Sequence, residues 1–164
     1  MEEEIKFNGS YSLKISRVKE NDFPYEGQQI ASTSELREFL KTLQSADNEK
    51  FIAMYMNADN RLICLQTTNG IVNQAVVYPR EVIRHALIVN ATAVIFAHNH
   101  PSGNTRPSEA DIRLTKIIQE VAKVLDITIH DHIIIAGDSD KFFSFREEGL
   151  LQESGSLGKE KIRQ

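Results

Sequence analysis

Two histidines separated by one residue, His98 and His100, stand at the end of an apolar run in the middle of the chain. If that run is a strand, its side chains alternate. Both imidazoles then point to one face with Cα atoms roughly 6 to 7 Å apart, close enough to bind one ion. Asp111 follows a loop that two prolines and a glycine can bend back toward the strand end. Two imidazoles and a carboxylate leave a fourth position for water, which is the ligand set of catalytic zinc.

Ser108 precedes Asp111 by three residues, and this spacing has a simpler interpretation. A serine followed three residues later by an acid is typical of the first turn of a helix, where the two side chains cap main-chain amides. The interpretations are compatible, because Ser108 can cap the helix while Asp111 binds the ion. Cys64 is the only cysteine, so neither an intrachain disulfide nor a cysteine-based zinc site is expected.

The composition is that of an ordinary globular protein. The chain has 164 residues, of which 41% are hydrophobic and 26% charged, and this length accommodates one domain with a full core. No apolar run approaches the roughly 18 residues needed to cross a bilayer, and the N-terminus is acidic where a secretory signal is basic. We therefore expect no membrane segment and a cytoplasmic location.

The charge argues against a protein whose main task is to bind nucleic acid. The net charge is −4, the wrong sign for gripping phosphate backbones. Lys159, Lys161 and Arg163 gather near the C-terminus, interrupted by Glu160, and could neutralise only a few phosphates. DNA binding is therefore expected to be weak and salt-sensitive.

Hydrophobic periodicity predicts strands that alternate with helices, without an internal repeat, and so indicates a single α/β sheet domain. The predicted strands cover residues 11–15, 51–56, 62–66, 72–77, 92–97, 127–135 and 142–145. The predicted helices begin at Ser32, Pro79 and Ser108 and end near Ser45, Asn90 and Asp126. The expected buried face of the last helix consists of Leu114, Ile117, Ile118, Val121 and Leu125.

The predicted strand 127–135 contains an acid at a position that should be apolar. Strict alternation places Asp131 on the same face as Ile129 and Ile133, where a buried carboxylate needs hydrogen-bond partners. His130 and His132 repeat the His-x-His spacing in the same strand. No serine or aspartate follows them at a suitable distance, so we do not expect a second metal site there.

The order His-x-His, seven residues, Ser, two residues, Asp resembles the signature of the JAMM (MPN-plus) metalloprotease superfamily. The runs Tyr78-Pro-Arg-Glu-Val82, Ala97-His-Asn-His-Pro-Ser-Gly103 and Asp131-His-Ile-Ile-Ile135 look like the RadC branch of that superfamily. The resemblance spans about 120 residues, from Thr33 to Leu151. It implies a single-domain, cytidine-deaminase-like α/β sandwich (the JAB1/MPN fold), in which helices flank a mixed β-sheet and His98, His100 and Asp111 hold zinc.

The resemblance also implies catalytic roles. Ser108 would hydrogen-bond the oxygen on which charge develops. Family members use an acid on an early strand to take a proton from water, and by order along the chain that acid is Glu49. Glu81 is the alternative base, although its position favours a role at the N-terminus of its own helix. Asp131 and His132 resemble a paired element of the RadC branch, which suggests either a contact that supports the metal ligands or a structural hydrogen bond.

The expected organisation is an N-terminal extension at residues 1–30, a RadC-like domain at 31–152 and a disordered tail at 153–164. Longer RadC-type proteins carry a helix-hairpin-helix-like region ahead of this domain. The residues before Thr33 are too few to encode it, which weakens the inference of DNA binding.

Two functions from different classes are consistent with these features. The first is a zinc-dependent hydrolase that acts on a peptide or isopeptide bond of a peptide or protein substrate. The second is a DNA-repair or mobile-element accessory protein with a non-catalytic metal site. A magnesium-dependent nuclease is disfavoured, because such enzymes prefer sites rich in carboxylates.

Overall fold

The computed structural model describes residues 3–6, 12–15, 27–30, 35–36, 40–41, 48–69, 77–137 and 141–152. Near the N-terminus, β1 (Glu3–Lys6) pairs antiparallel with β2 (Ser12–Ile15), which confirms the first predicted strand. The predicted tail at 153–164 lies outside the described residues, as do residues 72–76 of a predicted strand and most of the first predicted helix.

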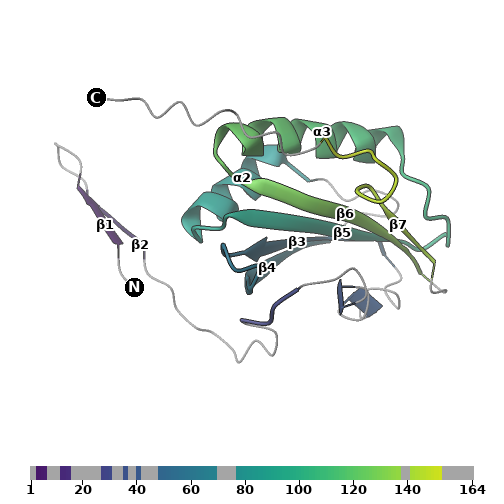
Figure 1. Cartoon of the computed structure of the whole chain (residues 1–164), viewed down its shortest axis with the longest axis horizontal. Helices are drawn as coiled ribbons and strands as arrows, with labels where there is room; N and C mark the ends of the chain where they lie inside the picture. The colour runs from purple at the N-terminus through teal and green to yellow at the C-terminus, as the bar shows by residue number, and fades with distance from the viewer. Residues whose placement is uncertain are drawn as a thin grey trace.

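The centre of the molecule is a mixed five-stranded sheet with the order β4-β3-β5-β6-β7 (Figure 1). β3 (Lys50–Met56) and β4 (Leu62–Asn69) form the predicted antiparallel hairpin. β5 (Ala93–His100) lies antiparallel to β3 and parallel to β6 (Thr128–Ala136). β7 (Phe142–Ser144) pairs antiparallel with β6. β5 is therefore paired with a strand along each edge, and residues of β5 are buried on both faces of the sheet, in keeping with its unbroken apolar sequence.

Helices α2 (Pro79–Ile88) and α3 (Glu109–Val124) cover one face of this sheet (Figure 1). The residues buried between them and the sheet form the helix-side core: Phe51, Ala53, Tyr55, Val82, Ile83, Ala86, Ala91, Val94, Phe96, Ile118, Ala122, Ile127 and Ile129. The other face buries the opposite-side core: Leu36, Leu40, Ile52, Met54, Met56, Leu62, Ala93, Ile95, Ala97, Ile133 and Ile135. The fold is thus a single α/β domain of the expected JAB/MPN type. In the described part of the chain, no helix is both long and apolar enough to span a bilayer.

Helix α3 buries only part of the predicted face, because Ile118 is buried and Leu114 packs against the helix-side core but the other three predicted residues are exposed. Ile117 and Val121 are 48% and 41% exposed, whereas Thr115, Ile118 and Ala122 are buried. The small Ala122 side chain allows close approach of the helix to the sheet, and the hydroxyl of Thr115 finds polar partners inside, so burying these residues carries no unpaired group. The prediction was wrong for Ile117, Val121 and Leu125 because it counted apolar residues and did not consider a polar residue with internal partners.

The predicted continuous alternation along β6 is also wrong. The pairing of β6 with β5 shifts by one residue at His130, so that this residue forms a bulge. A one-residue shift moves every following side chain to the opposite face. Ile129 accordingly packs in the helix-side core, whereas Ile133 packs in the opposite-side core.

Asp131 follows the bulge directly and is a structural hydrogen-bond centre. Its carboxylate accepts from the Ser144 hydroxyl at 2.6 Å and from the amides of His132 and Arg146 at 2.7 and 3.0 Å. Burial raises the pKa of this carboxyl, while these three donors act in the opposite direction. The acid joins β6 to β7 and to the turn that follows β7.

Replacing Asp131 with Ala is expected to lower the free energy of unfolding by about 2 to 4 kcal/mol, because three donors lose their acceptor in the interior. Urea denaturation measures this change. Asp131→Asn is the matched control, since its one remaining oxygen can still accept from the two amides and the loss should be smaller. Equal stability of Asp131→Ala and the unaltered protein would contradict the structural role.

Candidate metal centre

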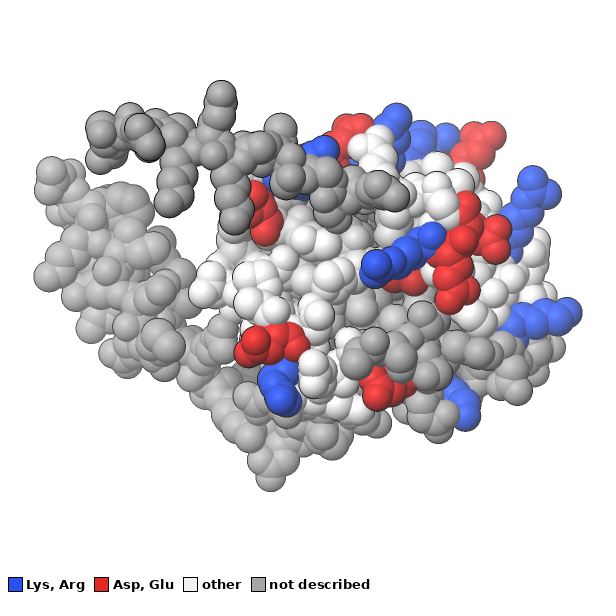
Figure 2. Space-filling model, in the orientation of Figure 1, with Lys and Arg blue, Asp and Glu red and all other residues white. Residues whose placement is uncertain are grey.

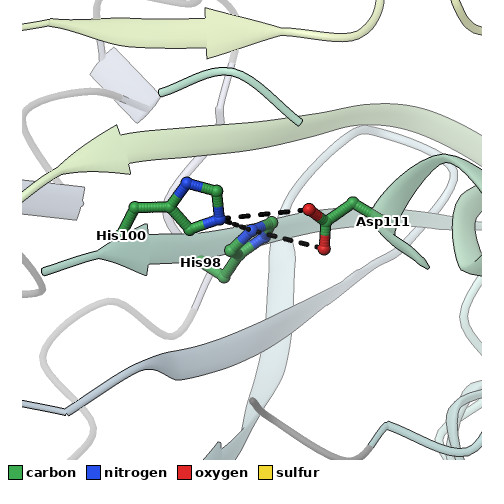
Figure 3. A group of neighbouring side chains, drawn as sticks. All are labelled: His98, His100 and Asp111. Atoms are coloured by element: carbon green, nitrogen blue, oxygen red, sulfur yellow. Dashed lines mark hydrogen bonds and ion pairs between the residues drawn. The ribbon is translucent and has the colours of Figure 1, made fainter. Parts of the chain in front are cut away.

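The two histidines of the His-x-His pair lie within β5, which continues past the predicted end of that strand to His100. His98 is 1% exposed and His100 is partly exposed. Their rings point to the same side of the sheet, toward α3 (Figure 3). Their Nε2 atoms are 3.0 Å apart. The alternation of side chains along β5 therefore brings the two imidazoles together as the spacing predicts.

Asp111 reaches the histidines from the first turn of α3 (Figure 3). Its Oδ1 lies 3.5 Å from the Nε2 of His98, and its Oδ2 lies 3.9 Å from the Nε2 of His100. The same carboxylate closes a capping box: Oδ2 accepts from the Ser108 amide at 2.7 Å, and the Ser108 Oγ accepts from the Asp111 amide at 3.1 Å. The Ser108 hydroxyl also donates to Oδ2 at 2.6 Å. Ser108 and Asp111 thus cap the helix, and the cap itself orients Asp111 toward the histidines.

The donor set fits a metal ion, because these groups bring lone pairs and negative charge to one point. The ring of His100 is oriented by a 2.5 Å hydrogen bond from Nδ1 to the carbonyl oxygen of Asn104, which leaves its Nε2 unprotonated in the neutral ring. Ligands bound tetrahedrally to zinc lie about 3.3 Å from one another. One ligand atom from each of His98, His100 and Asp111 lies within 4.8 Å of the other two, which is near that spacing, and they are the one group of potential ligands of this kind among the described residues.

His132 lies behind His98, away from Asp111. Its Nε2 is 2.8 Å from the Nδ1 of His98, and its Nδ1 is 2.6 Å from the hydroxyl of Thr115. The ring of His132 stacks on that of Phe145, with ring centroids 4.6 Å apart. Burial lowers the pKa of His98 to about 4 and places that of His132 well below its usual value, so both rings are neutral near pH 7.

A cleft of about 540 Å³ opens beside the histidines. Glu49, His100 and Ser108 all line it, so three of the residues singled out in the sequence share one cleft. The rest of its lining is Pro101, Ser102, Asn104, Arg106 and Pro107. These residues belong to the loop between β5 and α3 that the sequence predicts to bend back toward the strand.

Asn99, which lies between the two histidines, holds the segment that carries Glu49. Its side chain is buried, and because alternate residues of a strand face opposite sides, it points away from the histidine rings. Its Oδ1 accepts from the Lys50 amide at 2.7 Å, and its Nδ2 donates to the Asn48 carbonyl at 3.2 Å. The same strand thus places two candidate ligands and clamps the main chain on both sides of Glu49.

The remaining candidates lie elsewhere. Glu81 forms an ion pair with Arg84 and lines a second, smaller cavity of about 190 Å³ that includes neither His98, His100 nor Asp111. The bulge separates His130 from His132, and the ring of His130 bonds the side chain of Asn60 at 2.9 Å. The second His-x-His pair therefore does not converge on one point.

Sequence reasoning missed Asn99 and Thr115. Two signals could have found them: Asn99 is a polar residue in a buried strand, and Thr115 follows Asp111 by one helical turn, on the face that Asp111 turns toward the sheet.

A family model for the RadC-like JAB domain matches residues 30–150. The chain belongs to the RadC-like JAB domain family. Relatives include the UPF0758 proteins YkfG and YfjY of Escherichia coli (strain K12), which are 43% and 41% identical over 127 residues; the alignments cover 76% of this chain and 79% and 78% of theirs. A UPF0758 protein of Actinobacillus pleuropneumoniae serotype 5b (strain L20) is 40% identical over 144 residues, 83% of this chain but 64% of its own length.

For this RadC-like domain we predict about one zinc ion per chain, because two imidazoles and a carboxylate converge. His100→Ala should abolish binding. His130→Ala is the matched control, since it removes a histidine of the other His-x-His pair and should leave the zinc content unchanged. Metal analysis of the purified proteins measures the ratio. Full occupancy in a variant lacking both His98 and His100 would contradict the assignment.

The metal-free protein should lose stability as the pH falls from about 6.5 toward 4. The pKa of His98 is about 4 in the folded chain and about 6.5 when unfolded, so between these values the unfolded state binds the additional proton. The expected loss is on the order of a few kcal/mol. Urea denaturation across this pH range measures it. His98→Gln should flatten the profile, and an equally steep profile in that variant would assign the loss to other groups.

Proposed function

We propose that this protein is a zinc-dependent hydrolase that cleaves a peptide or isopeptide bond. The observation that carries the proposal is the convergence of His98, His100 and Asp111, together with a cleft that His100, Glu49 and Ser108 line. The membership of the RadC-like JAB domain family supports a metal-dependent hydrolase in general terms. The choice of an amide bond comes from the resemblance to metalloproteases.

A zinc ion bound there would lower the pKa of a coordinated water and polarise a carbonyl group. Glu49 is the residue to accept the water's proton and to donate it to the leaving amine. Its position in the cleft, between the two residues that Asn99 holds, suits this shuttle, because a general base must keep one place through both transfers.

Ser108 is the candidate donor to the oxygen that becomes negative. In this structure its hydroxyl donates to Asp111 Oδ2 at 2.6 Å. Donation to a substrate therefore requires the hydroxyl to rotate away from Asp111. The Ser108 amide continues to donate to the same oxygen, so the carboxylate keeps one of its two hydrogen bonds from Ser108 during that rotation.

The described surface favours a peptide over a polyanion as the partner. Figure 2 shows acidic and basic side chains interspersed on the visible face, as expected for a net charge of −4. The cleft lining contains one arginine, one glutamate and two prolines, without a row of cations to follow a phosphate backbone. The role as a DNA-repair accessory protein has no comparable support from the site.

Glu49→Gln should retain zinc and the fold but lose nearly all hydrolysis, because the amide fills the same volume and cannot accept the proton. The zinc-loaded protein is incubated with a proteome-derived peptide library that includes isopeptide-linked peptides, and mass spectrometry identifies the new termini. Glu81→Gln makes the same chemical change at the other candidate base and should leave the cleavage pattern intact.

Two results would count against this assignment. Unchanged cleavage by Glu49→Gln, together with an inactive Glu81→Gln, would show that Glu81 and not Glu49 is the general base. Absence of any zinc-dependent cleavage by the unaltered protein, across both kinds of linkage, would contradict the hydrolase itself.

A further inference from the structure

We propose that Thr115 and His132 are positioning residues that hold His98 in the one tautomer able to bind a metal ion. The proposal rests on the metal-binding part of the proposed function and is independent of the bond that is cleaved. It starts from a chain of three short contacts that runs from the main chain of α3 to the ring of His98.

The first contact determines the direction of the chain. The Thr115 hydroxyl lies 2.6 Å from the carbonyl oxygen of Asp111, one turn earlier in α3. A carbonyl oxygen only accepts, so the proton between these two atoms comes from the hydroxyl. Thr115 is 2% exposed, so bulk water does not compete for its hydroxyl group. With its proton used in this bond, the Thr115 oxygen is an acceptor for any further neighbour.

The second contact assigns the proton on His132. The Nδ1 of His132 is 2.6 Å from the Thr115 oxygen, which is already an acceptor, so Nδ1 carries the hydrogen. The ring is buried among Phe51, Phe96 and Phe145, with centroid distances of 5.8, 5.8 and 4.6 Å, and such apolar surroundings favour the neutral form. In the neutral ring the other nitrogen, Nε2, is therefore unprotonated.

The third contact transfers this choice to the metal ligand. Nε2 of His132 accepts from Nδ1 of His98 at 2.8 Å, so the proton of the neutral His98 ring is on Nδ1. The Nε2 of His98 then presents a lone pair toward His100 and Asp111. His100 obtains the same tautomer more simply, from the carbonyl oxygen of Asn104.

Removal of the Thr115 hydroxyl releases this constraint. His132 can then carry its proton on Nε2, which faces His98. To accept a hydrogen bond from this atom, Nδ1 of His98 must be unprotonated. The proton of His98 moves to Nε2, the atom that the metal requires. The proton must then leave Nε2 of His98 before a metal ion can bind there, so metal affinity falls although none of the three candidate ligands has been replaced.

The test compares Thr115→Val with Thr115→Ser. Valine has the shape of threonine without the hydroxyl, and serine restores the hydroxyl. Zinc affinity, measured by competition with a chelator, should fall about 10- to 100-fold in Thr115→Val and return toward the original value in Thr115→Ser. Thr128→Val makes the same chemical change at the first residue of β6, away from the candidate ligands, and this variant should bind zinc normally.

A second variant and a metal-free measurement separate this proposal from the proposed function. His132→Phe should keep the stacking on Phe145 and the fold, and it should lower zinc affinity by a similar factor. Nitrogen-15 NMR of the metal-free protein should show both His98 and His132 protonated on Nδ1 and should show that His98 changes tautomer in Thr115→Val.

Unchanged zinc affinity in a folded Thr115→Val, or a His98 protonated on Nε2 in the unaltered metal-free protein, would overturn the proposal. If the zinc affinities and NMR signals are as expected but no peptide is cleaved, the assignment of the His98 tautomer is supported and only the proposed hydrolase is contradicted. An unaltered protein that binds no zinc would contradict both.

Discussion

The alternation of side chains along β5 is the constraint on which the rest of the site depends. One strand, paired on both sides, sends His98 and His100 toward α3 and sends Asn99 the other way, to the segment that carries Glu49. The distance between the candidate ligands and the candidate base is therefore set by the pleat of one strand and its pairing with β3.

This arrangement is electrostatically unfavourable without a cation. Two Nε2 lone pairs 3.0 Å apart and a carboxylate face one another, and the usual relief, protonation of a ring, is opposed by the burial of His98. His98 is held by its contacts with Phe51 and His132, His100 by its bond to Asn104, and Asp111 by the capping box. A bound ion removes the repulsion, so metal binding and stability of the folded chain should be thermodynamically linked.

The elements and the ligand set could be predicted because each depends on local pattern. The helix at Pro79, the hairpin of β3 and β4 and the His-x-His pair are all determined by residue spacing of two or of about 3.6. The buried face of α3 and the bulge at His130 could not be predicted in this way. Both depend on partners distant in the sequence: Thr115 is buried because His132 receives its side chain, and the bulge depends on how β6 pairs with β5. Glu49 was identified only by its order along the chain. Its neighbours Lys50 and Asn48 are held by hydrogen bonds to Asn99, which is 49 and 51 positions away in the sequence.

The two His-x-His pairs show why spacing alone does not define a site. In β5 the strand is regular across the pair, so both rings lie on one face and meet Asp111. In β6 the bulge lies at the first histidine of the pair, so His130 bonds Asn60, while His132 enters the core and contacts His98. The same three-residue pattern thus yields a pair of candidate ligands in one strand and a single buried histidine in the next. What distinguishes them is the regularity of the strand. A second converging pair would compete for an ion, whereas His132 is turned away from that point and contacts one of the candidate ligands, which it is proposed to orient.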